Sequence, residues 1–522
     1  MSFGGLREAS PLLAVLNAVR ARDPAPEAGA FGEPTLDLQP SAAAPSTSGT
    51  PPIVYDPTAG PPLTPIQSAL RAATERLIAR ADRRNPLGAG DWRAARRAVA
   101  AFYAARFYEP VWVGENGLTK AGRSALRQLE RARDDGLDLS AFALPRGLKA
   151  GLAPDALAEA ETTIASAVVA YAEQATGSRV RPSRVSRFIF LTPAVADPGA
   201  ALAEVAAAAD PAQALAGFNP PQKGYRDLRA ALAGLDAPVA HAERRAPILS
   251  ADLDPVVAAL LGAGERRRRA KRAARERSHA ASASAALERA AVIANMEMWR
   301  WEPRDMGEKR IEVNVPDFSV AALDGDSVLF QARAIVGKPE TPTPLFSSLM
   351  RTVVINPSWR VPDSIIKKEM MAKLGSLSRR GYVVKTVRGR LTVRQLPGED
   401  NALGRIAFMF PNDHAIYLHD TPARELFDEE SRAFSHGCVR VENPVSLAAL
   451  VLDGGESGKW TEERIEAAFG TREQGVSLPL PLPVHLEYFT EFVDESGELQ
   501  QRRDVYGWTR GVEAALARES QD

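Results

Sequence analysis

The stretch Ser435-His-Gly-Cys-Val-Arg-Val441 holds the only cysteine of the chain, and it lies downstream of His419-Asp-Thr-Pro422. Five of the six positions from Ser435 to Arg440 are polar or conformationally special, which core packing does not explain. Upstream, the apolar run Ala415-Ile-Tyr-Leu-His419 has the texture of a strand that ends at His419. The 18 residues between His419 and Cys438 are enough to return the thiol to the imidazole.

Cysteine and histidine in this arrangement point to nucleophilic catalysis, because a thiol needs a nearby base or positive field to favour the thiolate. His419 is the candidate base, whereas His436 is too close to Cys438 along the backbone for easy pairing and would line the pocket. Gly437 permits a sharp turn and an oxyanion hole of backbone N–H groups. Arg440 would lower the thiol pKa or hold a substrate carboxylate.

These residues are also compatible with other kinds of site. A lone cysteine is often a buried core residue. A metal site of His414, His419, His436 and Asp420 has suitable ligand types, but its spacing matches no helical or finger pattern. The local cysteine motifs of caspase-like and papain-like proteases are absent, and a sortase-like enzyme would lack the Ser-His-Gly-Cys run.

The sequence around this stretch is rich in short β-branched runs. They occupy 310–316, 319–323, 328–336 and 352–356, and Asp324-Gly325 predicts a hairpin between two of them. Strand texture returns at 405–410. Residues 362–374 predict an amphipathic helix and 381–395 a hairpin turned at Arg388-Gly389, so that 362–397 would form a mobile capping flap.

The rest of the chain divides by composition. Residues 1–65 are rich in proline and predict disorder, and the short apolar run 11–19 within them is a poor secretion signal. Residues 66–240 predict an all-helical unit with Thr119 as a helix N-cap. Residues 241–290 predict a linker with eight basic residues between 265 and 277, and residues 491–522 a C-terminal extension. The predicted fold class is α+β, a helical domain followed by a mainly-β domain over residues 291–490.

Composition excludes several classes of protein. The chain has 522 residues, with 65 basic and 65 acidic side chains, so the excess of positive charge typical of nucleic-acid binding is missing. No apolar run is long enough for a transmembrane helix. One cysteine excludes an internal disulfide framework, a cysteine-rich zinc site and an iron–sulfur cluster.

At these residues the sequence resembles the L,D-transpeptidase family, with its YkuD-type catalytic domain. His419 and Ser435-His-Gly-Cys-Val-Arg440 match the family motif. Further similarity to the large periplasmic branch is found in the following segments: Asn295–Trp301, Val336–Pro339, Thr343–Ser347, Asn356–Trp359, Val361–Pro362 and Tyr417–Pro422. The helical segment resembles the scaffold domain of that branch, so the resemblance covers about 66 to 510.

This resemblance implies acyl transfer on peptidoglycan stem peptides. Cys438 would attack the diaminopimelate carbonyl of a donor tetrapeptide, with His419 as base and then as acid to the leaving D-alanine. Tyr417 and the N–H groups of Gly437 and Cys438 would bind the oxyanion, and Ser435, His436 and Arg440 would line the substrate site. Neither a metal nor a cofactor is implied, and carbapenems would trap Cys438.

The resemblance is compatible with more than one acceptor of the acyl group. It would be another stem, giving a 3-3 cross-link, or an outer-membrane protein to be attached to peptidoglycan, and hydrolysis of existing links is a third outcome. A non-catalytic cell-wall-binding scaffold is the alternative of another class. The family's three-helix peptidoglycan-binding module has no recognisable pattern between Asp236 and Ala290. The implied location is the periplasm or cell envelope of a Gram-negative bacterium.

Overall fold

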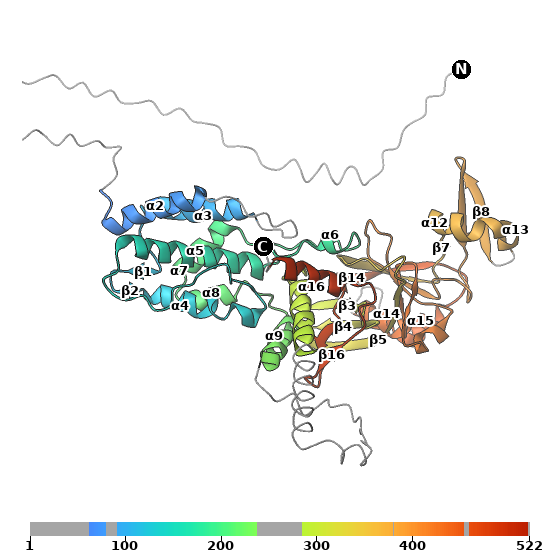
Figure 1. Ribbon diagram of the computed structural model, residues 1–522. Coiled ribbons are helices and arrows are strands. Elements are labelled where there is room, and N and C mark those ends of the chain that lie inside the picture. The colour runs from blue at the N-terminus through green and yellow to red at the C-terminus, as the bar shows by residue number, and fades with distance from the viewer. Residues whose placement is uncertain (1–61, 80–90, 237–283, 379–380, 454–458, 520–522) are drawn as a thin grey trace, which may run out of the picture. The chain divides into compact units, whose positions relative to one another are not determined.

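The computed structural model describes residues 62–79, 91–236, 284–378, 381–453 and 459–519 (Figure 1). The predicted disorder of residues 1–65 concerns mainly residues outside these ranges, as do the apolar run 11–19 and the basic run 265–277. Residues 284–290, which the sequence assigned to the linker, are part of a helical stretch over 284–299. Among the described residues, no helix combines the length and apolar character that crossing a bilayer requires.

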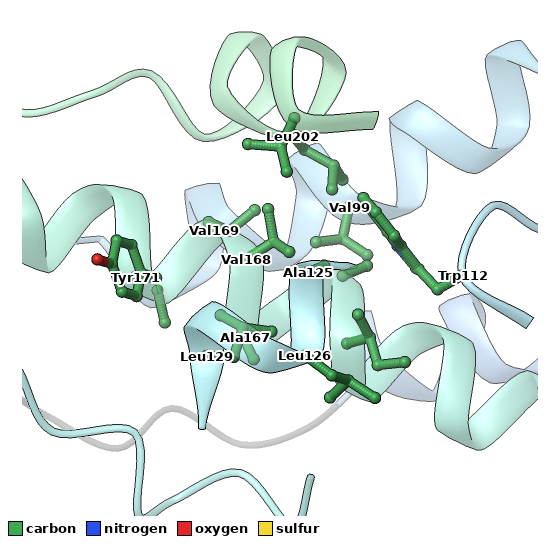
Figure 2. Close-up of a cluster of buried hydrophobic side chains, with 14 of the residues drawn as sticks. Val99, Trp112, Ala125, Leu126, Leu129, Ala167, Val168, Val169, Tyr171 and Leu202 are labelled. Atoms are coloured by element: carbon green, nitrogen blue, oxygen red, sulfur yellow. The ribbon is translucent and has the colours of Figure 1, made fainter. Parts of the chain in front are cut away.

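The N-terminal part is helical, as expected, apart from one small two-stranded hairpin, and is built around one long central helix, α5 (Pro154–Ala175). Its buried valines, alanines and isoleucine pack against the apolar sides of the neighbouring helices, which Figure 2 shows for Val168, Val169, Val99, Leu126 and Leu202. The other elements are α2 (Pro65–Ala79), α3 (Trp92–Ala105), β1 (Val113–Gly114), β2 (Gly117–Leu118), α4 (Lys120–Leu129), η1 (Ala132–Asp135), α6 (Pro182–Val185), α7 (Pro198–Ala207), α8 (Pro211–Ala216) and α9 (Lys223–Asp236).

Side-chain hydrogen bonds set the start of α4 and anchor the neighbouring hairpin. Thr119 caps α4 as predicted, because its side chain accepts a hydrogen bond from the Gly122 N–H at 2.9 Å. The buried Glu161 on α5 accepts hydrogen bonds from the Tyr103 hydroxyl at 2.7 Å and from three successive backbone N–H groups, those of residues 111–113. These bonds fix the small β1–β2 hairpin against α5.

The C-terminal part is built on a nine-stranded sheet of order β12-β5-β13-β11-β10-β6-β14-β3-β4, in which β4 also pairs with β5. Its buried face forms one apolar core with α14 (Pro444–Leu452) and α15 (Glu462–Ala467). The strands are β3 (Lys309–Asn314), β4 (Ser319–Asp324), β5 (Ser327–Gly337), β6 (Ser347–Ile355), β10 (Ile406–Met409), β11 (Leu418–His419), β12 (Ala433–Ser435), β13 (Val439–Val441) and β14 (Gln474–Glu487). The predicted hairpin at Asp324-Gly325 joins β4 to β5.

Three smaller elements follow the sheet in the chain. They are β15 (Glu491–Val493), β16 (Leu499–Gln501) and α16 (Trp508–Glu519), within the predicted C-terminal extension. Residues of α16 belong to a third apolar core, shared with α9 and with the helical stretch 284–299. The segment 491–519 is therefore packed into the protein and contributes to its core.

An insertion between β6 and β10 contains the residues predicted to form a capping flap, together with β7, and is called the capping insertion after that prediction. It has a small apolar core of its own. Figure 1 shows α12, α13, β7 and β8 grouped together in orange. A three-stranded sheet of order β7-β9-β8 combines β7 (Trp359–Arg360) with the predicted hairpin, β8 (Tyr382–Val387) and β9 (Arg390–Gln395). The hairpin turns at Arg388-Gly389, both with positive φ.

The helix predicted over 362–374 is not regular. The segment instead forms α12 (Asp363–Ile365), the π-turn η2 (Ile366–Met370), the 3-10 turn η3 (Met371–Lys373) and α13 (Leu374–Leu377). Ile366 and Leu377 are buried in the core of the insertion, so tertiary packing, rather than helical periodicity, sets the local conformation. π-Turns recur at functional sites, and this one carries Glu369.

Candidate active site

The pairing of β11 with β13 brings the predicted catalytic residues to one face of the sheet. The strands are parallel, with Leu418 opposite Val439 and His419 opposite Arg440. Because side chains alternate between the two faces of a strand, the fully buried Leu418 and Val439 face the core. The opposite face therefore carries the polar set, which consists of Tyr417 and His419 from one segment and Cys438 and Arg440 from the other.

Direct contacts agree with this register. The Val439 N–H donates to the Tyr417 carbonyl at 3.2 Å, and the rings of Tyr417 and His419 lie 5.6 Å apart between centroids. The thiol of Cys438 lies 3.7 Å from the carbonyl oxygen of Ala415. The strand predicted over 415–419 is shorter than expected, because Ala415 adopts a left-handed conformation (φ 55°) that interrupts the extended backbone.

The turn before Cys438 is held by the side chain of Ser435. Its hydroxyl donates to the Cys438 carbonyl at 2.5 Å and accepts from the Gly437 N–H at 3.0 Å. The expectation that the Gly437 N–H binds the oxyanion is therefore not met in this structure, since that N–H is already satisfied. Ser435 is buried, and its hydroxyl shapes the turn.

Gly437 itself is required by the geometry. Its φ of 122° is a conformation that residues with a side chain rarely adopt. A Cβ atom at this position would also lie 3.2 Å from the terminal methyl group of Ile416. This confirms the predicted sharp turn at Gly437, although its role differs from the one expected.

Two residues outside the predicted site support this turn, and one of them, Thr343, begins a segment that resembles the family. Thr343 donates through its hydroxyl to the Gly437 carbonyl at 2.8 Å and accepts from the Gly337 N–H at 2.9 Å. The hydroxyl of Tyr506 donates to the Gly337 carbonyl at 2.5 Å. No sequence signal reveals these contacts, because they join residues 94 and 169 positions apart.

His419 is buried and its tautomer is fixed. The Nδ1 atom lies 2.5 Å from the backbone carbonyl oxygen of Asp420, which can only accept, so Nδ1 carries the proton and Nε2 has the free lone pair. Burial, reinforced by the positive charge of Arg440, lowers the pKa of His419 to about 3. The imidazole is therefore neutral at physiological pH and able to act as a base.

The thiol of Cys438 is also neutral at rest, even though the charge of Arg440 lowers its pKa as expected. Burial raises the pKa of Cys438 to about 11, although hydrogen bonding from Tyr417 and the charge of Arg440 act in the opposite direction. Desolvation outweighs the arginine because the thiolate would lose its hydration. The resting pair is thus a thiol and an imidazole, not a thiolate and an imidazolium.

This protonation state predicts a distinctive pH profile for alkylation of the free protein by iodoacetamide. Only the thiolate reacts, and its fraction rises with pH until the pKa of about 11 is reached. We expect the rate of Cys438 modification to increase about tenfold per pH unit between pH 7 and 10. The measurement is intact-mass labelling with a cysteine peptide as control, whose profile levels off near its pKa of about 8.5. An inflection between pH 5 and 7 would show a preformed ion pair instead.

Tyr417 stays protonated beside the thiol. Burial and the neighbouring Cys438 raise the pKa of its phenol well above the ordinary value. The hydroxyl is therefore a hydrogen-bond donor throughout the physiological range. Arg440, on the same face, is largely buried, and its Nε atom has no hydrogen-bond partner among the described residues.

The remaining histidines of the predicted set point elsewhere. His436 is exposed, and its Nε2 atom lies 2.8 Å from the Glu369 carboxylate on the capping insertion. His414 stacks on Phe190 with ring centroids 3.9 Å apart. Within the described ranges, no three His, Cys, Asp or Glu side chains gather as metal ligands.

Two protein families match parts of this chain. Residues 308–458 match the YkuD family, described as the L,D-transpeptidase catalytic domain, and residues 97–232 match the family described as the Scaffold domain. A Haemophilus influenzae protein named "Putative L,D-transpeptidase" is 34% identical over 229 residues, covering 39% of this chain. The aligned segment spans 45% of that relative, somewhat under half its length.

The chain also has a weak similarity to solved structures. An L,D-transpeptidase from Mycobacterium smegmatis shares 15% identity with a TM-score of 0.20, covering 34% of this chain and 58% of that one. L,D-transpeptidase 1 from Mycobacterium tuberculosis shares 13% identity with a TM-score of 0.17, covering 34% and 60%. TM-scores this low carry no weight beside the sequence matches. Residues 308–458 thus match the L,D-transpeptidase catalytic-domain family, and residues 97–232, upstream of them, match the scaffold-domain family.

Proposed function

We propose that the chain is a peptidoglycan L,D-transpeptidase that works through a cysteine acyl-enzyme. The observation that carries the proposal is the register of β11 and β13, which brings His419 and Cys438 to one face. The hydrogen bond from Nδ1 to Asp420 leaves Nε2 of His419 as the available base. A positioned base beside a thiol is the arrangement that nucleophilic catalysis requires.

The first half-reaction forms a thioester. His419 Nε2 takes the proton of the Cys438 thiol as Sγ attacks the diaminopimelate carbonyl of the donor tetrapeptide. The bond to D-alanine breaks, and the leaving amine receives that proton from Nε2. The proton moves only during attack, because at rest the pKa of about 11 at Cys438 and of about 3 at His419 keep both groups neutral.

The second half-reaction transfers the acyl group. An acceptor amine attacks the thioester carbonyl and loses its proton to His419, and the thiol of Cys438 is regenerated with that proton. In both halves the negative charge on the carbonyl oxygen needs donors. We assign the Tyr417 hydroxyl, protonated and adjacent to Cys438, and the Cys438 N–H, since the Gly437 N–H is occupied by Ser435.

Arg440 has a separate role in this proposal. Its positive charge favours the developing thiolate and disfavours a protonated His419 before substrate arrives. Its guanidinium group also suits a substrate carboxylate. His436 is placed at the border of the site, where its contact with Glu369 links the catalytic turn to the capping insertion.

The acceptor, the location and the inhibitor follow from the same chemistry. We propose a second stem peptide as acceptor, giving a 3-3 cross-link, with an outer-membrane protein as the alternative. Such substrates place the enzyme in the periplasm or cell envelope. Carbapenems carry a strained, reactive acyl group and would acylate Cys438. A non-catalytic wall-binding scaffold is disfavoured, because such a protein would not need the fixed tautomer of His419.

The function is tested by incubating the full chain with purified sacculi and identifying the muropeptides by mass spectrometry. We expect release of D-alanine from tetrapeptide stems and the appearance of 3-3 linked dimers. A matched reaction with sacculi containing only tripeptide stems should give no new dimers, because they lack the leaving group. Loss of existing cross-links without new ones would indicate hydrolysis, and unchanged sacculi would contradict the proposal.

A further inference from the structure

The three-stranded sheet of the capping insertion places four basic residues on one face. Arg360 on β7 is paired with Arg394 on β9, and Arg390 and Lys385 lie on the same face in the neighbouring rows, opposite Val387 and Thr392. Directly paired residues of an antiparallel ladder share a face, and so do residues two positions apart. We call this face, defined by Arg360, Lys385, Arg390 and Arg394, the basic sheet face.

The basic sheet face is turned to solvent, because the other face of the same sheet is covered. Val384, Leu391 and Val393 on that other face pack with Ile366 and Leu377 from the helical segment. The four basic side chains are all exposed. The alternation in this hairpin therefore separates an apolar, covered side from an open side that carries the four basic residues together with Val383, Val387 and Thr392.

The positive charge of this face is only partly balanced. Asp363 pairs with Arg390, and Glu473 lies 3.8 Å from Arg394. Arg360 and Lys385 have no acidic partner among the described residues. Positive charges that lack acidic partners on one surface create a local positive potential, which attracts anions.

The position of this face separates it from the reacting atoms. The contacts of the insertion with the catalytic residues come from its other side, through Glu369 to His436 and through the side chain of Trp359 to Tyr417. Trp359 packs against the core of the insertion, on the covered side of the sheet. The basic sheet face therefore has no part in the chemical steps and is suited to holding a larger partner.

We propose that the basic sheet face docks the enzyme onto the carboxylates of peptidoglycan stem peptides. The inference rests on the proposed function and extends it to a second surface of the substrate. A stem with diaminopimelate and a terminal D-alanine carries a free carboxylate on each of these residues, so the sacculus is a repeating polyanion. Guanidinium groups bind carboxylates well, and several weak contacts on one polymer add through effective concentration.

The test measures binding without turnover. The full chain with Cys438→Ala is pelleted with purified sacculi, alone and combined with Arg360→Gln and Lys385→Gln. The control is Lys367→Gln with Lys368→Gln, which removes the same charge from exposed positions on the helical segment of the same insertion. We expect the first pair to weaken binding about three- to tenfold, at ~0.3–0.7 kcal/mol per exposed contact, and the control pair to change it less than twofold.

Salt and chemically modified sacculi sharpen the result. The difference between the two pairs should shrink as the salt concentration rises from 50 to 500 mM, since exposed charges are screened. It should vanish on sacculi whose carboxylates have been converted to amides. Circular dichroism of both variants should match that of the parent, because all four positions are exposed.

Three outcomes would overturn the inference. The first is equal binding of sacculi by all variants. The second is an equal loss of binding in both pairs, which would reflect net charge alone. The third is a loss of binding confined to anionic phospholipid vesicles, which would indicate a membrane surface. The proposed function is judged separately, by carbapenem acylation of the same variants with Cys438 intact. Absence of acylation would count against the function, whereas the binding comparison depends only on the basic sheet face.

Discussion

Replacing Cys438 by alanine is expected to abolish acyl-enzyme formation and cross-linking together. Because Cys438 is the only cysteine of the chain, no other thiol can take over the attack. Removing a nucleophile of this kind lowers turnover by ~10⁴-fold or more. The measurement is the intact mass of the protein after incubation with a carbapenem, where the parent chain should gain the mass of the inhibitor and the variant should keep its own mass.

The control for this prediction separates chemistry from folding. Cys438→Ser keeps nearly the same volume and a hydroxyl in place of the thiol, and it should also lack the adduct on the timescale of minutes. Both variants should unfold within a few degrees of the parent, since each change removes or replaces only the sulfur atom of one side chain. A carbapenem adduct on Cys438→Ala would show that another side chain is the nucleophile.

Features that depend on neighbouring residues were predictable from the sequence. The turns at Asp324-Gly325 and Arg388-Gly389 lie where expected, since residues that tolerate positive φ mark hairpins locally. The Thr119 cap depends only on the N–H group three residues away. The placement of His419 and Cys438 on one face of the sheet was also suggested, because the loop between them is long enough to return the thiol to the end of the upstream strand.

Features that depend on distant contacts were not predictable. The turn before Cys438 is held by Thr343 and Tyr506, which are far away in sequence. A sequence pattern reports neither burial nor the partner of each backbone group. The early end of the strand before His419 similarly follows from the left-handed conformation of one alanine, a residue with no local preference for it.

Burial also explains why the expected thiolate is absent. From the sequence, Arg440 was expected to lower the thiol pKa, and its charge does act in that direction. The same charge lowers the pKa of His419, so a single arginine favours one half of an ion pair and disfavours the other. Desolvation then decides the resting state, and a neutral thiol is less exposed to oxidation, because the thiolate is the form that oxidants attack.

His419→Ala is expected to reduce acylation and turnover by ~10³- to 10⁴-fold at pH 7. With a pKa of about 11, roughly one Cys438 thiol in 10⁴ is ionised at that pH, so the reaction depends on a base that takes the proton during attack. The residual rate of the variant should rise about tenfold per pH unit, because hydroxide replaces the imidazole. The measurement is the rate of carbapenem acylation between pH 6 and 10 by stopped-flow absorbance.

His436→Ala is the matched control, because it removes an exposed imidazole from the same turn while leaving Nε2 of His419 in place. We expect this variant to lose less than about tenfold and to keep the pH dependence of the parent, as its contact is with Glu369 rather than with the thiol. The two variants therefore differ in the shape of the pH profile as well as in rate. Equal residual rates with identical profiles would overturn the choice of His419 as the base and would place His436 beside the reacting atoms.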